Sequence, residues 1–470
     1  MNPDIAPTLR VFLDELASAG ELREITARLD VRHEISAALS LLDPGLGGTG
    51  PAVRMTNVAD SRMPVVGNIY GSRRRIARSL GLAGNDLHES FLAALGARHD
   101  PRPNSDAPWQ AVQVPDPDLT AELPVPWFFE HETGPYLTAG VIVAREPATG
   151  RGNLSIARLK PLRGARAMVG IAPNHHLAAF ARQAQERGEP LELAVCLGVE
   201  PAVLLAACLY LAQGDDEMAY AGGLARRPID VVELSAGGPK VPVESEIVLV
   251  GTLEPSELVE EGPVSEFHGM YERYGSGPVF TATRLLRRED AFLQVVEPGL
   301  HTEHVLLGAV AIEAGLTRQL RRRIPAVRAI RVTDEGAGRL AARVALGPHR
   351  RGLARQVMHA IWGEVSLIKN IVVLDEDVPL DDAAEVDRAI QLRVRPDRDL
   401  MVVPYSAADR AEPLEREGLG TRLGIDATRW PDDRDWTPAA PPRAALDRVA
   451  GLIGFDRRPR LPVADQKPPE

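Results

Sequence analysis

The sequence predicts an α/β (α+β) protein built in three parts: an α/β segment, a barrel-like β domain and a second α/β unit. Three observations support this prediction. Apolar residues at helical spacing alternate with short β-rich runs in residues 1 to about 100, and again after residue 302. Short apolar runs separated by Gly and Pro fill the middle of the chain. The length of 470 residues also exceeds what one hydrophobic core usually organises.

The N-terminal part is expected to alternate helices and strands. Residues 8–22 place apolar side chains at helical spacing, and Gly20 stands where such a helix would stop. Ser72 stands where its hydroxyl can cap a basic helix that runs to Leu80. Two elements are predicted between them, a helix over residues 33–42 and a strand over residues 63–69.

The middle part begins where regular structure is interrupted. Residues 100–126 are dense in Pro and Asp and cannot hold a long helix or strand, so we place a boundary at residue 110. An inserted helix is expected over residues 202–212. Strands are expected over residues 137–145, 154–159, 191–197, 231–234, 247–253, 279–286 and 291–296. Many short strands of this kind favour a barrel-like sheet in a domain of residues 111–305.

The C-terminal part, residues 306–470, returns to an α/β pattern. Helices are predicted near residues 305–322 and 351–362, and strands over residues 327–332 and 370–374. The tail from residue 430 onward is rich in Pro, Asp and Arg and has one helical stretch, residues 442–453. We expect this tail to wrap a neighbouring part of the chain or a partner subunit.

Composition narrows the classes of function. The 54 basic and 65 acidic residues give a net charge of −11, which argues against nucleic-acid binding because phosphates attract a basic face. No segment reaches the roughly 18 apolar residues of a membrane span, and no secretory signal is visible, so a cytoplasmic protein is expected. Cys196 and Cys208 are too few for a disulfide framework or a four-thiolate metal site.

The first group of candidate functional residues is the stretch 153–158, which follows a turn at residues 149–152. On a regular strand, Asn153 and Ser155 share one face and Arg158 points to the other, unless a bulge or turn redirects it. An Arg on a strand is more often a surface cation. The functional alternative is a two-point clamp for a carboxylate or phosphate.

The second and third groups stand at the starts of two predicted helices. His175 and His176 follow Asn174, and adjacent histidines in a capping turn are more often surface residues. Neutral imidazole is nevertheless the commonest metal ligand, and a helix N-terminus suits a nearby phosphate. The acidic run that ends at Glu217, taken alone, indicates a helix N-terminus with favourable negative charge.

The fourth group is a pair of carboxylates, Glu261 and Glu266. Gly262 and Pro263 exclude a continuous helix between them, so a bend could aim both side chains into one cavity. Beside an Arg, such carboxylates can have their pKa values pushed apart, which equips one of them for proton transfer. The alternative is an acidic surface loop.

Together, in this order and at these separations, the four groups resemble the UbiD-type family of prenylated-FMN-dependent (de)carboxylases. The resemblance extends from the first helix to about residue 400 and includes Gly67-Asn68 and residues 124–126, 133–140 and 241–248. It implies a UbiD-like fold in which the middle part is a split β-barrel that binds the flavin. It also implies a homodimer or homohexamer supported by the C-terminal tail.

The resemblance assigns a cofactor site. Asn153, His176 and Glu217 match the protein ligands of a Mn²⁺ (or Mg²⁺) ion that holds the phosphate of prenylated FMN, and family members often bind K⁺ beside it. Oxygen ligands with one imidazole suit such ions. A flavin prenyltransferase would supply the cofactor. Further positions that match the flavin surroundings are Ser155, Ile156, Ala157, Arg158, His175 and Lys369. Arg393 matches an Arg of the family that comes further along the chain.

The resemblance also assigns catalysis. Arg158, Glu261 and Glu266 match the family's Glu–Arg–Glu network, in which Arg158 orients the substrate carboxylate and Glu266 exchanges the proton that replaces CO₂. We expect an apolar wall to raise the pKa of Glu266. The implied reaction is reversible decarboxylation of an α,β-unsaturated or (hetero)aromatic carboxylic acid. The alternatives are an ordinary FMN oxidoreductase, which needs neither the metal nor the paired carboxylates, and a non-catalytic or partner-dependent subunit of a carboxylase complex.

Overall fold

The computed structural model describes residues 5–82, 87–172, 175–209, 211, 214–430, 439 and 441–454. The chain divides into two compact units, Met1–Ala427 and Thr428–Glu470, and each is described by itself. Among the described residues, no helix has both the length and the apolar character needed to cross a membrane. The domain boundaries at residues 110 and 305 stay predictions.

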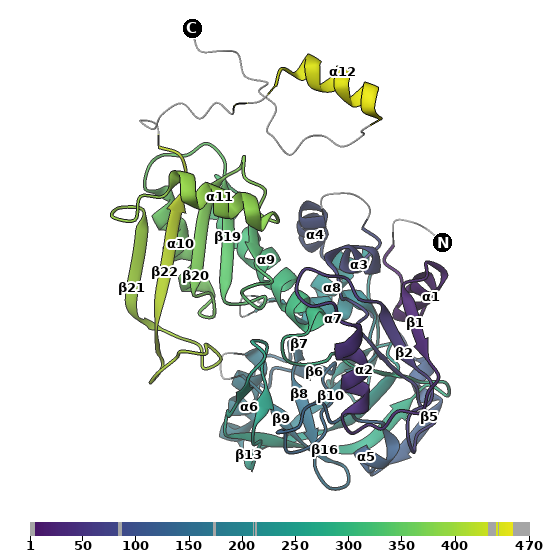
Figure 1. The fold of residues 1–470 in the computed structure, drawn as a ribbon. Helices are drawn as coiled ribbons and strands as arrows, with labels where there is room; N and C mark the ends of the chain where they lie inside the picture. The colour runs from purple at the N-terminus through teal and green to yellow at the C-terminus, as the bar shows by residue number, and fades with distance from the viewer. Residues whose placement is uncertain are drawn as a thin grey trace. The chain divides into compact units, whose positions relative to one another are not determined.

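The N-terminal part has the predicted alternation of helices and strands (Figure 1). The Thr8 hydroxyl accepts a hydrogen bond from the Val11 N–H at the start of the first helix, and Gly20, just beyond its end, has a φ of 70°. The Ser72 hydroxyl accepts from the Arg75 N–H in the same way. The predicted stop at Gly20 and cap at Ser72 are therefore confirmed. The elements are α1 (Leu9–Ser18), β1 (Leu22–Ile25), α2 (Glu34–Leu42), β2 (Ala52–Met55), β3 (Val65–Gly67), α3 (Arg73–Ser79) and α4 (Leu87–Gly96).

The central strands form one curled sheet in the order β7-β6-β10-β13-β16-β9-β8, with β5 paired to β16 (Figure 1). The strands at the two ends of this order, β7 and β8, are separated in sequence by Ala157 alone. One residue cannot span a flat sheet whose strands lie about 4.8 Å apart, so the sheet curls until its ends meet. The predicted barrel-like domain is confirmed as a half-barrel. Its strands are β5 (Val112–Pro115), β6 (Val141–Arg145), β7 (Gly152–Ile156), β8 (Arg158–Pro161), β9 (Arg166–Gly170), β10 (Leu191–Leu197), β13 (Ile247–Glu260) and β16 (Ser276–Arg287).

Helices and short strands surround this sheet. The inserted helix predicted over residues 202–212 ends at residue 207, and its predicted last residue lies outside the described residues. The helices and 3₁₀ turn are η1 (Pro108–Gln110), α5 (Leu119–Glu122), α6 (His176–Arg187), α7 (Pro201–Ala207) and α8 (Glu217–Ala225). The short strands are β4 (Arg102–Pro103), β11 (Asp230–Glu233), β12 (Lys240–Pro242), β14 (Val264–Ser265), β15 (Tyr271–Glu272) and β17 (Leu293–Gln294).

After the long helix α9 (Thr302–Arg323), the chain forms a five-stranded sheet in the order β18-β19-β20-β22-β21. The predicted strands correspond to β18 and β20, whereas β19, β21, β22 and α11 were not predicted. The elements are β18 (Val327–Val332), β19 (Ala341–Leu346), α10 (Leu353–Glu364), β20 (Asn370–Asp375), α11 (Ala383–Arg393), β21 (Leu400–Ala407) and β22 (Leu419–Ala427). In the second unit, α12 (Arg443–Ile453) confirms the helical stretch of the tail.

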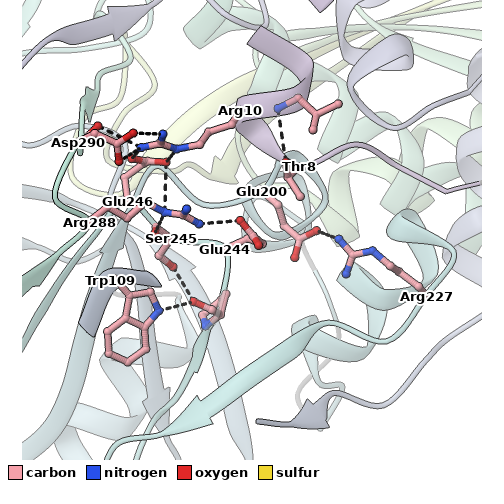
Figure 2. A network of polar contacts seen from close by, with 12 residues as sticks. Thr8, Arg10, Trp109, Glu200, Arg227, Glu244, Ser245, Glu246, Arg288 and Asp290 are labelled. Atoms are coloured by element: carbon pink, nitrogen blue, oxygen red, sulfur yellow. Dashed lines mark hydrogen bonds and ion pairs between the residues drawn. The ribbon is translucent and has the colours of Figure 1, made fainter. Parts of the chain in front are cut away.

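A polar network joins α1 to the start of β13 (Figure 2). Nε and Nη2 of Arg10 each donate to one carboxylate oxygen of Glu246 at 2.7 Å, and Nη1 donates to Asp290 at 2.6 Å. Arg288 lies beside the same carboxylate and donates to Glu244 at 2.7 Å. Because these contacts link residues more than 200 positions apart in sequence, they fix the N-terminal helix on the central sheet.

Candidate active site

A cavity of about 640 Å³ is lined by the seam where β7 and β8 meet. Its size lies in the range of roughly 300–1,000 Å³ that small-molecule sites occupy. The starts of α6 and α8, the loop after β13, one face of α9 and residues 409–411 also contribute to the wall. Most of the site residues predicted from the sequence line this cavity: Asn153, Ser155, Ile156, Ala157, Arg158, His175, His176, Glu217 and Glu266. Residue 174 lies outside the described residues.

The direction of Arg158 depends on the break at Ala157. A continuous strand would place Arg158 on the face opposite to Asn153 and Ser155. The structure ends β7 at Ile156 and begins β8 at Arg158, so the chain changes strand and direction between them. All three side chains consequently line one cavity.

Glu261 lies behind the cavity wall and holds Arg158. Nε and Nη2 of Arg158 donate to the two carboxylate oxygens of Glu261 at 2.5 and 2.7 Å. Gly262 has a φ of 81°, which confirms the predicted bend after Glu261, and the Lys160 ammonium donates to the Glu261 carbonyl at 2.6 Å. Burial lowers the pKa of Arg158, but the pair with Glu261 outweighs this and leaves a net pKa above the usual range. Arg158 is therefore a permanent cation in a fixed orientation.

Glu266 is the carboxylate that faces the cavity. The Tyr274 hydroxyl donates to Oε2 of Glu266 at 2.7 Å, and the Phe267 N–H donates to Oε1 at 2.9 Å. The loop before it is anchored by Glu132, whose Oε1 accepts from the Ser265 hydroxyl at 2.8 Å. Both oxygens of Glu266 are thus held at known positions next to Arg158.

The expected rise in the pKa of Glu266 is wrong for this arrangement. Burial does raise the pKa of Glu266 and is the largest single effect. The hydrogen bonds from Tyr274 and Phe267, together with the charge of Arg158, stabilise the carboxylate and bring the net pKa below its usual value. Glu266 is consequently a carboxylate near neutral pH before substrate binds.

The three residues predicted to hold a metal lie together at the other end of the seam. Nδ1 of His176 is 3.5 Å from Oε1 of Glu217 and 3.5 Å from Nδ2 of Asn153. The Leu154 N–H donates to Oε2 of Glu217 at 3.1 Å, and the Ser155 hydroxyl donates to Oδ1 of Asn153 at 2.8 Å. One imidazole, one carboxylate and one amide oxygen fit a Mn²⁺ or Mg²⁺ ion. Among the described residues, no group of three or more His, Cys, Asp or Glu could hold a metal ion, and this set contains two such residues and one amide.

Several residues of the cavity were not singled out in the sequence: Tyr274, His304, Arg339 and Arg410. Tyr274 lies between two cations, with its ring centroid 5.3 Å from Cζ of Arg158 and 4.3 Å from Cζ of Arg410. Burial, helped by the charge of Arg339, lowers the pKa of His304 to about 4, and its Nδ1 lies 2.9 Å from the Gly299 carbonyl. No local motif marks these residues, because they come from four separate segments.

Lys369 and Arg393 do not line the cavity. The Lys369 ammonium lies 2.8 Å from Oε1 of Glu412, directly after the residues 409–411 that do line it. Arg393 pairs with Asp377 at 2.9 Å, at the end of α11. The structure therefore places Lys369 behind the cavity wall, and direct contact with a flavin stays a prediction.

Comparison with known proteins places this geometry in a family. Models of 3-octaprenyl-4-hydroxybenzoate carboxy-lyase match in three stretches: the N-terminal domain over residues 13–95, the Rift-related domain over residues 102–301 and the C-terminal domain over residues 305–427. Anhydromevalonate phosphate decarboxylase of Methanothermobacter thermautotrophicus is 32% identical over 422 residues, which cover 89% of this chain and 96% of the relative. The chain belongs to the UbiD family.

Solved UbiD-class structures share the whole fold. HmfF from Pelotomaculum thermopropionicum in complex with FMN is 30% identical and superimposes with a TM-score of 0.87, covering 95% of this chain and 100% of that chain. An evolved dimeric form of HmfF in complex with prFMN is 29% identical with a TM-score of 0.84, covering 94% and 98%. These likenesses confirm the predicted UbiD-like fold and the prediction of a carboxy-lyase.

Proposed function

We propose that this UbiD-family protein catalyses the prenylated-FMN-dependent, reversible decarboxylation of an α,β-unsaturated or (hetero)aromatic carboxylic acid. One observation carries the proposal. Arg158, which Glu261 holds from behind the wall, and Glu266 line the same cavity as Asn153, His176 and Glu217. A positioned cation and a positioned carboxylate therefore face the same space as a set of metal ligands.

Asn153, His176 and Glu217 would hold a Mn²⁺ or Mg²⁺ ion and, through it, the phosphate of prenylated FMN. Their donor types fit such an ion, and the cavity volume of about 640 Å³ fits a bound small molecule. When bound, prenylated FMN supplies an electron sink for the carbanion-like centre that decarboxylation creates. K⁺ beside the phosphate, supply of the cofactor by a flavin prenyltransferase and a homodimeric or homohexameric assembly belong to the same proposal.

Arg158 would orient the carboxylate that leaves. Nε and Nη2 are occupied by Glu261, while among the described residues Nη1 has no hydrogen-bond partner. A substrate carboxylate can accept from this free N–H group, and the rigid pair with Glu261 fixes the direction of that bond. Glu261 thus acts through Arg158.

Glu266 would move the proton. A substrate carboxylate bound at Arg158 brings a negative charge close to Glu266 and shares the positive charge that stabilises it. Both effects raise the pKa of Glu266 from a value below its usual range, so substrate binding favours its protonated form. Once CO₂ has left, the protonated carboxyl can donate to the substrate carbon, and in the reverse direction the carboxylate accepts that proton.

The proposal is tested by co-expressing the chain with a flavin prenyltransferase. Mass spectrometry of the purified protein should show prenylated FMN, and metal analysis should show a divalent ion that the Glu217→Gln variant retains poorly. The loaded protein should release CO₂ from an unsaturated or aromatic acid, or exchange H for D at the product carbon. Nicotinamide-dependent hydride transfer with unmodified FMN would contradict the proposal, as would activity that appears only with added subunits.

A further inference from the structure

Arg339 is a second cation in the wall of the cavity, and nothing described in the structure neutralises it. It lies in the loop between β18 and β19, and its guanidinium stacks over the Phe267 ring with Cζ 5.0 Å from the ring centroid. Its Nη1 is buried and has no hydrogen-bond partner among the described residues. An arginine without a hydrogen-bond partner is unfavourable in a buried wall. Because Nη1 itself is shielded, a ligand in the cavity would offer its acceptor to the remaining N–H groups of Arg339, which lines that cavity.

The neighbours of Arg339 leave its charge intact. His304 is neutral at pH 7, since its pKa is lowered to about 4, and burial raises the pKa of the Cys208 thiol far above neutrality. Glu364, another residue of the cavity wall, lies 3.6 Å from Arg323. Arg410, the other arginine of the cavity wall without an assigned role, differs from Arg339 because its Nη2 already donates to a backbone carbonyl.

Helix α9 is shaped to admit this guanidinium. A Cβ atom on Gly308 would lie 2.5 Å from Cζ and 2.6 Å from both terminal nitrogens of Arg339. Glycine in the interior of a helix costs about 1 kcal/mol relative to Ala, so a glycine here is explained by the close approach of Arg339. The side chain is therefore held against α9 at a defined place.

This place lies close to the proton-transfer residue. Phe267, which supports the guanidinium, follows Glu266 directly in sequence, and His304 interacts electrostatically with both Glu266 and Arg339. The residues proposed to hold the metal and cofactor phosphate come from β7, α6 and α8 instead. None of these ligands is among the neighbours of Arg339 given above, which include Phe267, Gly308 and His304, so we take an anion at Arg339 to be a separate group from the cofactor phosphate.

We propose that Arg339 binds a second anionic group of the substrate, a phosphate monoester or a second carboxylate, while Arg158 binds the carboxylate that leaves. The preferred substrates are then acids with two anionic ends. This inference rests on the proposed function and assigns its substrate class. A guanidinium can donate two parallel hydrogen bonds to groups of this kind.

The test compares two acids of equal length on the prenyl-FMN-loaded protein: glutaconate, with two carboxylates, and 2-pentenoate, with one. Calorimetry measures the binding of both acids and of inorganic phosphate, and CO₂ release is followed separately. Wild type should bind glutaconate more tightly than 2-pentenoate. Arg339→Gln should weaken glutaconate or phosphate binding by about 10- to 100-fold, the value of a charge-assisted bond, and leave 2-pentenoate nearly unchanged.

Gly308→Ala provides an independent variant, because the new methyl group displaces the guanidinium without removing it and Ala suits a helix better than Gly. It should reproduce the loss seen for Arg339→Gln, and Arg339→Lys should restore part of the binding. Arg328→Gln, on the neighbouring strand and outside the cavity, is the matched control and should match wild type.

Three results would overturn the inference. Wild type could bind the two acids equally, or it could bind neither glutaconate nor phosphate. Arg339→Gln could also lose the same affinity for both acids. Failure of the proposed function gives a different result: no acid releases CO₂, yet glutaconate or phosphate binding still depends on Arg339.

Discussion

Two arginine–glutamate pairs in this protein have nearly the same geometry and different surroundings. Arg158 donates to both oxygens of Glu261 at 2.5 and 2.7 Å, and Arg10 donates to both oxygens of Glu246 at 2.7 Å. Asp290 accepts from Nη1 of Arg10, whereas Nη1 of Arg158 has no hydrogen-bond partner among the described residues, and Arg158 lines the cavity together with Glu266. The geometry of a pair therefore does not reveal its role; the donors that it leaves free do.

The largest effect is expected for Glu266→Gln. The amide keeps the shape of the side chain and cannot exchange a proton, so decarboxylation by the loaded protein should fall by about 10²- to 10⁴-fold. Rates of CO₂ release measure the effect. The matched control is Glu260→Gln on an exposed neighbour, which should keep the wild-type rate. Full activity in Glu266→Gln would remove Glu266 from the mechanism.

A smaller loss is expected for Arg158→Lys. Lysine retains the charge but cannot hold Glu261 with a planar fork while also donating to a substrate. The kcat/KM for decarboxylation should fall by about 10- to 100-fold, in line with the loss of one charge-assisted bond. The melting temperature should change little because the buried carboxylate keeps a cation beside it. A variant with unchanged kcat/KM would show that the free donor of Arg158 has no role in orientation.

The other pair should give the opposite result. Arg10→Gln removes the main partner of Glu246, whose side chain is only 2% exposed, although Arg288 remains 3.5 Å away. We expect the free energy of unfolding to fall by about 1–3 kcal/mol, while kcat/KM stays at the wild-type value. Denaturant unfolding and steady-state kinetics on the same preparation measure both quantities. A loss of activity without a loss of stability would erase the contrast between the two pairs.

The sequence predicts elements well where the local pattern is strong. The strands predicted over residues 191–197 and 327–332 match β10 and β18, because both are compact runs rich in β-branched or apolar residues. The strand β19 was missed since its Ala-rich sequence has no strand preference of its own. The polar end of β13, residues 254–260, is a strand only because it pairs with β16 across an irregularity in register.

The site residues divide in the same way, between local patterns that the sequence reveals and contacts between distant segments that it does not. The resemblance joined four groups, each compact in sequence but far from the others, yet the direction of Arg158 depends on the strand break at Ala157, which no spacing rule predicts. The position of Arg339 depends on Gly308 of another element, 31 positions away in numbering, and on the ring of Phe267. Such long-range contacts leave no local pattern. The direction of the pKa change of Glu266 was missed because it depends on where the Tyr274 hydroxyl, the Phe267 N–H and the charge of Arg158 lie around the carboxylate.

The smallest and most specific effect is expected for Tyr274→Phe. The Tyr274 hydroxyl donates to Glu266 and stabilises its carboxylate, which is one cause of the lowered pKa. Removing this donor destabilises the charged form, so the pKa of Glu266 rises and its acid form persists to higher pH. The alkaline limb of the kcat profile, where decarboxylation loses the protonated form, should therefore move to higher pH.

Tyr271→Phe is the control, because Tyr271 lies outside the cavity and its hydroxyl accepts from a backbone N–H. A shift to lower pH in Tyr274→Phe, or an equal shift in both variants, would mean that Arg158 and not Tyr274 sets the ionisation of Glu266.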